Sequence, residues 1–164
     1  MMRNAVALLV AGMTALMLGG CGWHLAGTLP GQAPLGLVQI KGEGFGAAVL
    51  LRESLRSSRD VKLIEQDDPA ALQISILGDA TGRRIVALSG AGRAREFEIV
   101  QTVRFNVRYQ GVDLIPTDTI EFRSQISYDD SSVLSKEYEI AALVESMQRD
   151  AAAQILRRAA ALQR

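Results

Sequence analysis

The sequence has little of what most enzyme and metal sites need. Among its 164 residues there is one cysteine, Cys21, and one histidine, His24. A single cysteine excludes an internal disulfide, and one cysteine with one histidine leaves few ligands for a transition-metal site. For the same reason, most of the nucleophile and general-base pairs used by enzymes lack one of their two members. The composition therefore argues against an enzyme and against a bound metal.

The chain also lacks an excess of charge of either sign. Its 18 Lys and Arg balance 18 Asp and Glu, whereas binding to nucleic acid needs surplus positive charge to neutralise phosphates. Hydrophobic residues make up 48% and charged residues 22% of the chain, a balance that supplies a packed core and argues against disorder. We expect a folded protein with no nucleic-acid partner.

No hydrophobic run is long enough for a permanent membrane span. The longest, Ala5 to Leu18, has 14 residues and follows the positive charge of Arg3. As a helix it would reach roughly 21 Å, short of the ~30 Å hydrocarbon core of a bilayer. This length is typical of the hydrophobic part of a signal peptide.

The residues after this run indicate lipidation. Leu18-Gly19-Gly20-Cys21 places a leucine three residues before the cysteine and two small residues directly before it, as in a lipobox. In such a motif the thiol takes a diacylglyceryl group, the signal is cleaved before the cysteine, and the new amine is acylated. Two or more acyl chains anchor a protein stably. The alternative is an ordinary secretory signal whose cleavage happens to leave a cysteine.

These features predict three segments. Residues 1–20 form a lipoprotein signal peptide, 21–34 a lipidated tether with three Gly and two Pro, and 35–164 a single domain. We expect no cofactor other than the covalent N-acyl diacylglyceryl lipid on Cys21. Since no acidic residue directly follows Cys21, the sequence around it resembles that of lipoproteins sorted to the outer membrane.

The domain reads as an α+β two-layer sandwich. Alternating apolar and polar residues predict half-buried strands, and apolar residues at helical spacing predict helices. We expect strands at 35–40, 72–76, 93–109 and 120–128, helices at 45–57 and 134–162, and an ambiguous segment at 61–68. Turns are expected at Thr81-Gly82, with 83–88 beginning the returning strand, and at 111–116. The result is an about four-stranded, mostly antiparallel sheet with two helices packed on one face.

Several segments resemble the LptE family. The opening Cys21-Gly22-Trp23-His24-Leu25-Ala26-Gly27 is similar to the Cys-Gly-aromatic-His-Leu-x-Gly start of these outer-membrane lipoproteins. The order of elements after it also fits the family. So do three stretches of the C-terminal helix, residues 134–139, 147–151 and 154–158.

The resemblance implies a function without catalysis. LptE-like proteins sit as a plug in the lumen of a large outer-membrane β-barrel, LptD. They assist the folding of that barrel and bind lipopolysaccharide during its insertion into the outer leaflet. We therefore expect a lipid-anchored protein at the cell outer membrane, with its domain in the barrel lumen or on its periplasmic side. The alternative is a structural lipoprotein of another envelope assembly machine, without a lipid-binding role.

A cluster of arginines is the candidate lipopolysaccharide-binding site. The segment from residue 83 to 108 holds six Arg and only two Glu, and arginine binds phosphate with two parallel hydrogen bonds. Together with a lysine suggested by the family pattern, the expected contacts are Arg83, Arg84, Arg93, Arg95 and Lys136. The alternative is that these side chains solvate an exposed sheet face or pair with Glu96 and Glu98. By strand alternation, Arg93 and Arg95 fall on the apolar face.

Other chemically suggestive residues have simpler explanations. His24 is interpreted as a packing or hydrogen-bonding residue, because no second histidine is present, and Trp23 as a contact to the membrane interface or the barrel. The glycines at 89–92 lack the Gly-Lys-Ser/Thr of a phosphate-binding loop and indicate a turn. Asp129-Asp130 could bind Ca²⁺ or act as catalytic carboxylates in a hydrolase, but capping of the following helix explains the pair better.

Overall fold

The computed structural model describes residues 35–58, 61–128 and 132–162. The predictions for the signal segment, the tether, Cys21 and the Asp129-Asp130 pair lie outside the described residues. None of the helices in the described part is both long and apolar enough to cross a membrane.

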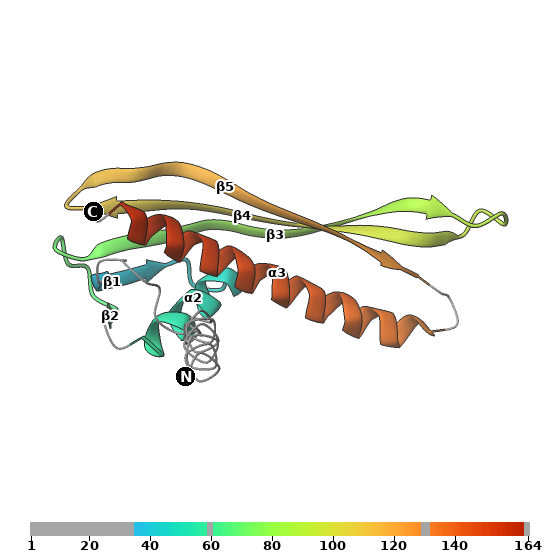
Figure 1. Ribbon diagram of the computed structural model, residues 1–164, viewed down its shortest axis with the longest axis horizontal. Coiled ribbons are helices and arrows are strands. Elements are labelled where there is room, and N and C mark those ends of the chain that lie inside the picture. The colour runs from blue at the N-terminus through green and yellow to red at the C-terminus, as the bar shows by residue number, and fades with distance from the viewer. Residues whose placement is uncertain (1–34, 59–60, 129–131, 163–164) are drawn as a thin grey trace, which may run out of the picture. The chain divides into compact units, whose positions relative to one another are not determined.

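Five strands form one mixed sheet, and two helices cover one of its faces (Figure 1). Along the sheet the order is β2-β1-β3-β4-β5; β1 is parallel to β2 and to β3, whereas β3, β4 and β5 are antiparallel. The elements are β1 (Gly36–Lys41), α2 (Gly46–Arg56), β2 (Val61–Ile64), β3 (Leu72–Leu88), β4 (Ala94–Tyr109), β5 (Val112–Ser127) and α3 (Val133–Ala161).

The predicted α+β class is confirmed, with one strand more than expected. The additional strand is β2, which comes from the ambiguous segment at 61–68. Because β1, α2 and β2 form a parallel β–α–β unit, the sheet is less uniformly antiparallel than the alternation in the later strands indicated. The expected antiparallel meander is present as β3, β4 and β5.

The expected turn at Thr81-Gly82 is wrong. Both residues pair with β4, opposite Gln101 and Val100, so β3 runs on through them as one strand of 17 residues. The chain reverses instead at 89–92, where the Gly92 amide donates to the Ser89 carbonyl at 2.9 Å. Since a continuous partner strand supplies the ladder hydrogen bonds, Gly82 does not break the strand.

The second turn is also shorter than expected. Gln110 and Gly111 have φ angles of 50° and 80°, the two positive values of a two-residue hairpin. β5 therefore begins at Val112 and contains Pro116. β5 is the last strand of the sheet, and proline is tolerated on such an edge because its missing N–H removes no ladder bond.

The helices bury the stripes that the spacing predicted. α2 buries Ala47, Ala48, Leu51 and Leu55. On α3, Ile140, Met147, Ala151 and Ile155 are buried, whereas the predicted Leu162 is 42% exposed. The predicted capping of α3 is absent at its N-cap residue Ser132, whose side chain forms no capping hydrogen bond.

The core is divided into two clusters by a polar group. The larger cluster joins α2, the C-terminal half of α3 and sheet residues such as Val103 and Phe105. The smaller cluster contains Ile99, Ile126, Ile140 and Met147. On the helix-facing side of β4, Gln101 lies between Ile99 and Val103 and is fully buried.

Asp79 holds this polar group together, which we call the Asp79 hub: Asp79, Thr81, Gln101, Gln148 and the Ala47 amide. The Asp79 carboxylate accepts hydrogen bonds from the Ala47 N–H at 2.8 Å, from the Gln148 amide at 3.1 Å and from the Gln101 amide. Thr81 in turn donates to Gln101 at 2.6 Å. Because Phe45 cannot cap α2, Asp79 supplies that function from β3 and ties α2, α3 and the sheet together.

Candidate functional site

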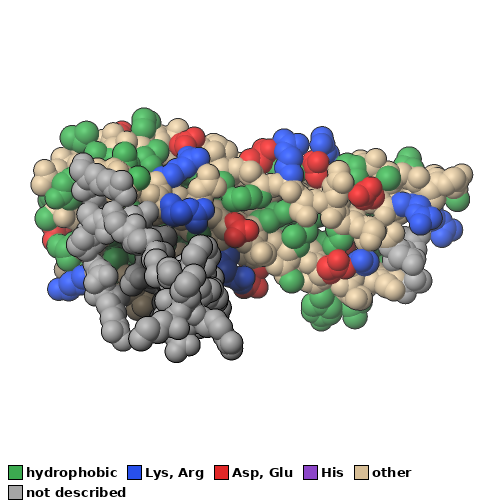
Figure 2. All heavy atoms as spheres, in the orientation of Figure 1, with side chains coloured by type: hydrophobic (Ala, Val, Ile, Leu, Met, Phe, Trp, Pro, Cys, Tyr) green, Lys and Arg blue, Asp and Glu red, His purple; other side chains and the backbone are tan. Residues whose placement is uncertain are grey.

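The predicted basic residues of the described part lie at the end of the sheet that is remote from α2. We call this region the distal end: residues 83–98 of the β3–β4 hairpin, the end of β5 and the first turns of α3. Figure 1 shows the hairpin extending past the end of β5 and the start of α3. Lys or Arg side chains are visible at the surface of this end in Figure 2.

Arg83 is built into the domain and forms a clasp between β3 and α3. Its Nη1 lies 2.8 Å from the Glu137 Oε1 of α3. Its guanidinium carbon is 3.8 Å from the centre of the Phe97 ring and 5.3 Å from that of Tyr128. The two rings meet edge to face at 4.9 Å. A guanidinium over an aromatic face is an attractive arrangement, so Arg83 has partners that a ligand would need to displace.

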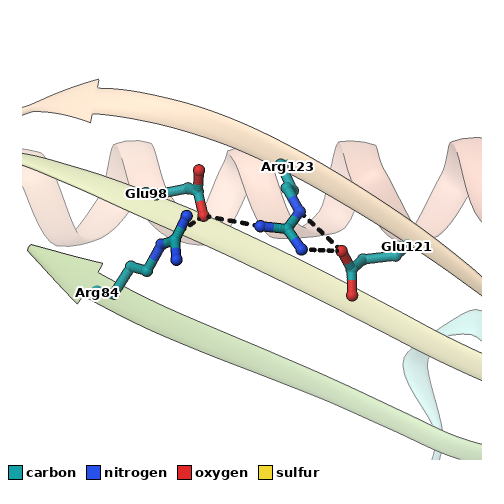
Figure 3. A network of polar contacts seen from close by, with 4 residues as sticks. All are labelled: Arg84, Glu98, Glu121 and Arg123. Atoms are coloured by element: carbon teal, nitrogen blue, oxygen red, sulfur yellow. Dashed lines mark hydrogen bonds and ion pairs between the residues drawn. The ribbon is translucent and has the colours of Figure 1, made fainter. Parts of the chain in front are cut away.

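Arg84 lies on the opposite, helix-free face of the sheet. Its Nε is 2.7 Å from Glu98 Oε2, and its side chain is 61% exposed. The Glu98 carboxylate also faces Arg123 Nη1 at 3.4 Å, and Arg123 contacts Glu121 at 2.6 Å. Figure 3 shows these four residues as a chain of alternating charges across β3, β4 and β5.

Arg123 is held in its charged form by its neighbours in this chain of charges. Hydrogen bonding to Glu121 raises the pKa of Arg123 above its already high usual value, so Arg123 stays charged. Glu98 is 7% exposed and carries the two guanidinium partners that a buried carboxylate needs. One alternative left open by the sequence was that a candidate arginine pairs with Glu98. Arg84 forms that pair.

Arg93 and Arg95 belong to the tip of the hairpin. The Arg93 N–H donates to Ser89 Oγ at 3.1 Å and its carbonyl accepts from the Ser89 N–H at 2.7 Å, which closes the turn. The Arg95 carbonyl accepts from the Tyr128 N–H at 2.8 Å. Both residues are exposed. Arg95 has no residue opposite it in β3, because the pairing passes from Ala87–Glu96 to Leu88–Ala94. Alternation along β4 therefore does not assign Arg95 to a face of the sheet.

Lys136 lies in the first turns of α3, beside the helix residue that binds Arg83. Its Nζ is 2.7 Å from Glu139 Oε2, and its side chain is 21% exposed. The structure thus places Lys136 on the helix side of the distal end and Arg84 on the other side. The five predicted residues share one end of the domain but do not form a single patch.

Exposed apolar side chains accompany these cations. Leu88 at the end of β3 is 61% exposed, and Leu134 and Tyr138 on α3 are 71% and 70% exposed. Ile85 and Val86 on β3 are also exposed, at 54% and 40%. Isolated apolar side chains are common on surfaces, but here they share the distal end with the candidate basic residues. The distal end therefore offers both charged and apolar contacts.

The partners that hold the arginines were not predicted from the sequence. Glu137, Phe97 and Tyr128 form the Arg83 clasp, and Arg123 completes the ion chain of Glu98. Cross-strand register would have indicated Arg84 opposite Glu98, because the two residues are direct partners in β3 and β4. No local signal connects Arg83 with Glu137, 54 residues later.

Comparisons with known proteins agree with this fold. The family model LptE, described as lipopolysaccharide-assembly, matches residues 43–159. The LPS-assembly lipoprotein LptE of Pectobacterium atrosepticum is 31% identical, with 96% of this chain and 86% of that protein covered. The protein of the same name from Yersinia pestis is 28% identical, with 95% and 76% covered.

Two solved structures are similar as well. The crystal structure of rare lipoprotein B from Shewanella oneidensis has a TM-score of 0.68 and 26% identity, and covers 78% of this chain and 96% of that one. The solution structure of lipoprotein B from Nitrosomonas europaea has a TM-score of 0.71 and 27% identity, with 87% and 93% covered.

Proposed function

The chain belongs to the LptE lipopolysaccharide-assembly family, and we propose that it is a lipid-anchored outer-membrane protein that plugs a large β-barrel of the LptD type. We further propose that it binds lipopolysaccharide as that ligand passes to the outer leaflet. The anchor would be the acylated Cys21, followed by the 21–34 tether and the 35–164 domain. No catalytic step is required, since the proposed action is binding and steric.

One observation supports lipopolysaccharide binding above others: exposed cations and exposed apolar side chains share the distal end. Arg93 and Arg95 are the exposed cations, at the tip of the β3–β4 hairpin. The first turns of α3 carry Lys136, whose side chain is 21% exposed, and Leu134 and Tyr138, which are more than two thirds exposed. Lipopolysaccharide combines phosphates with acyl chains, so it needs both kinds of contact. Arginine suits the phosphates because its fork donates two parallel hydrogen bonds.

The described contacts also support a stiff plug. The Arg83 clasp fastens α3 to β3 at the distal end, and the Asp79 hub fastens α3 to β3 and β4 nearer the middle. The helix-free face carries the ion chain of Arg84, Glu98, Arg123 and Glu121. The lumen of such barrels is polar, which suits a plug with a charged sheet face.

A double charge reversal tests the binding site. We expect Arg93→Asp with Lys136→Asp to weaken retention of lipopolysaccharide by the full-length chain in a pull-down at least fivefold, because both positive charges become negative. The matched control is Arg104→Asp with Arg157→Asp, which makes the same charge change at exposed positions outside the distal end. Circular dichroism verifies that both variants are folded.

The outcomes separate two functions. Weaker binding only in the Arg93→Asp, Lys136→Asp variant supports the proposed site. Equal weakening in this variant and in the control shows that the loss of binding is an effect of net charge. Undiminished binding by the folded distal variant contradicts the site and favours a structural lipoprotein without a lipid-binding role. One observation favours that second function: Arg83, Arg84 and Lys136 each already pair with a glutamate of this chain.

A further inference from the structure

β5 is the last strand of the sheet, and no described strand pairs with its outer side. Figure 1 shows β5 along the margin of the sheet. A strand in this position presents a row of unpaired N–H and C=O groups, to which another extended chain can add as a further strand. None of the five candidate lipopolysaccharide contacts belongs to β5, so the proposed function leaves this edge unused.

The register of β4 and β5 identifies the residues whose backbone points outward from this edge. From Asp118 to Ser127 the pairing with β4 runs without a shift. One residue further, the Tyr128 N–H donates to the Arg95 carbonyl at 2.8 Å. Because hydrogen-bonded and non-hydrogen-bonded pairs alternate along an antiparallel ladder, the even-numbered residues of this stretch direct their backbone groups at β4. The odd-numbered residues direct both N–H and C=O outward.

Only the first part of the edge is protected within the described residues. Pro116 offers no N–H, and the outward N–H of Thr119 donates to the carboxylate of Asp118 at 2.7 Å. Four further outward N–H groups form no hydrogen bond within the described residues, those of Glu121, Arg123, Gln125 and Ser127. All four residues are exposed. The unprotected part of the edge is therefore the second half of β5.

This part carries one acid and one base at neighbouring outward positions. Glu121 and Arg123 form the end of the ion chain that begins at Arg84 (Figure 3). Both contacts of Arg123 with Glu121 use the Oε1 atom of Glu121. Its other oxygen, Oε2, can therefore accept from a second guanidinium.

The two charges select one register if β5 pairs with β5 of a second copy. In an antiparallel pair of identical strands, a two-fold axis passes through one position, and residues at equal distances on either side of it lie opposite each other. An axis at Glu121 or at Arg123 places like charges opposite each other, which is destabilising. An axis at Ile120 or at Ser124 places both charges opposite neutral residues. An axis at Phe122 places Glu121 of each copy opposite Arg123 of the other, so both pairs are attractive.

The same register brings two aromatic rings together. Since Glu121 and Arg123 point outward, Phe122 meets Phe122 of the second copy as a non-hydrogen-bonded pair, in which the Cα atoms are about 4.5 Å apart. Phe122 is half-buried and packs against both core clusters. An aromatic pair across two strands stabilises their pairing.

We propose that the outer edge of β5 binds a second copy of this chain, antiparallel and centred on Phe122. The two five-stranded sheets then form one continuous sheet, and the ion chains of the two copies join at Glu121 and Arg123. A single pair of strands buries less than the about 1,200 Å² of a stable interface, so the dimer is weak. It can therefore separate before one copy enters a barrel.

Sedimentation equilibrium of the full-length chain in density-matched detergent tests the pairing. Micelles are kept in large excess, so that two chains do not share a micelle by chance. We expect a reversible monomer–dimer equilibrium with a dissociation constant of roughly 10–100 μM. Hydrogen exchange should show that the amides of Arg123 and Gln125 become more protected as the protein concentration rises.

Charge exchange tests the register. Glu121→Arg places two arginines on each edge, and Arg123→Glu places two glutamates there, so each variant alone should dimerise at least tenfold more weakly. Mixed in equal amounts, the two variants should pair with each other, because every charge then meets its opposite. The double variant, Glu121→Arg with Arg123→Glu, should also recover the dimer.

The matched control exchanges the charges of an exposed ion pair on α3. Glu145→Arg and Arg149→Glu make the same charge changes away from the edge of β5, and each should alter dimerisation less than twofold. Circular dichroism verifies that every variant is folded. A general effect of net charge would weaken the control variants as much as the β5 variants.

Several results would overturn the proposal. These are a monomer at all concentrations, undiminished dimerisation of the folded single variants, equal weakening in the control, or no recovery in the mixture. Protection of the Arg123 and Gln125 amides that is independent of concentration would also overturn it, by assigning the edge to another segment of the same chain. Neither lipopolysaccharide nor a barrel enters this experiment, so its result does not depend on the proposed function.

Discussion

At the residue scale, Arg83 shows how a side chain suited to bind a phosphate is instead used to hold the fold. It contacts Glu137 and the rings of Phe97 and Tyr128 at once. By contrast, Arg84 pairs with one glutamate and remains 61% exposed. Two neighbouring arginines of a strand thus have different roles, because neighbours in a strand face opposite sides of the sheet.

The Arg83 clasp predicts a stability difference between two variants. We expect Arg83→Ala to lower the free energy of unfolding by about 1–2 kcal/mol, since it removes a stacked cation and a half-exposed ion pair. Arg83→Lys should recover less than half of this loss, because an ammonium lacks the planar fork. Urea unfolding measures both. Arg104→Ala is the control, and a loss as large as that of Arg83→Ala would contradict the clasp.

The Lys41–Asp67 pair predicts a pH dependence. Hydrogen bonding to Lys41, and then to Gln39, lowers the pKa of Asp67 below its usual value of 3.8. A carboxyl whose pKa is lower in the folded state stabilises the fold above the unfolded value and loses that effect as pH falls through the folded value. The stability difference between the unaltered chain and Asp67→Asn should therefore shrink from pH 6 to pH 2. A constant difference would contradict the pairing.

Alternation along the sequence predicts which face of the sheet a side chain occupies, but it fails for Asp79. Alternation of Leu72, Ile74 and Ile76 would place Asp79 on the solvent face. A bulge at Leu77 shifts the register between Ile76 and Gly78, so Asp79 turns toward the helices. One inserted residue moves every later side chain of a strand to the opposite face of the sheet. Counting alternate residues along the sequence therefore could not place Asp79 on the helix side.

At the element scale, α3 crosses both core clusters and is fastened at two polar points. The Asp79 hub holds it through Gln148, and the Arg83 clasp holds it through Glu137. Gly46 lies so close to the hub that a Cβ there would stand 2.6 Å from the Gln148 side chain. The start of α2 and the middle of α3 therefore meet at a position that accepts only glycine without displacing Gln148.

The hub predicts a large effect of one carboxylate. Asp79→Ala would leave the Gln101 and Gln148 amides without their acceptor, and each buried unpaired group costs about 1–3 kcal/mol. We expect a loss of about 3 kcal/mol in the free energy of unfolding. Asp150→Ala, on the exposed side of α3, is the control and should change it by less than ~0.5 kcal/mol. Equal effects in urea unfolding would exclude a role for the hub.

The division of the core predicts uneven protection along α3. Its N-terminal half covers the small cluster around Ile99 and Ile126, whereas its C-terminal half packs into the large one. We expect amides of residues 148–161 to exchange with solvent at least roughly tenfold more slowly than those of 137–147. Local opening of residues 137–147 disrupts fewer buried contacts, so it costs less free energy. Uniform protection along the helix, measured by hydrogen exchange, would contradict two separable clusters.

Element types were easier to predict than their ends. Both helices and the three strands predicted from alternation are present, because amphipathic periodicity reflects burial on one face. The strand predicted from the short apolar run at 35–40 is present as β1. The ends of β3 and β5 differed from expectation because cross-strand pairing carried Thr81, Gly82 and Pro116 into strands. Such pairing is nonlocal, so turn-forming residues alone did not show where the strands end.

At the scale of the whole molecule, the family, the α+β class and the arrangement of helices on one face could be predicted. The short opening motif and the helix segments led to the family, which the comparisons confirm. The grouping of the candidate basic residues could not be predicted, since their assignment to two faces depends on the bulge and the register of β3. Their role in lipopolysaccharide binding remains a prediction.

The most direct test of the account is an affinity purification from outer membranes. The full-length chain, tagged at its C-terminus, is extracted in mild detergent, and the proteins retained after a salt wash are identified and quantified. The account predicts a roughly one-to-one complex with a large heat-modifiable β-barrel. Recovery of the chain alone, or with periplasmic proteins only, would contradict the plug and leave the distal basic residues without an assigned ligand.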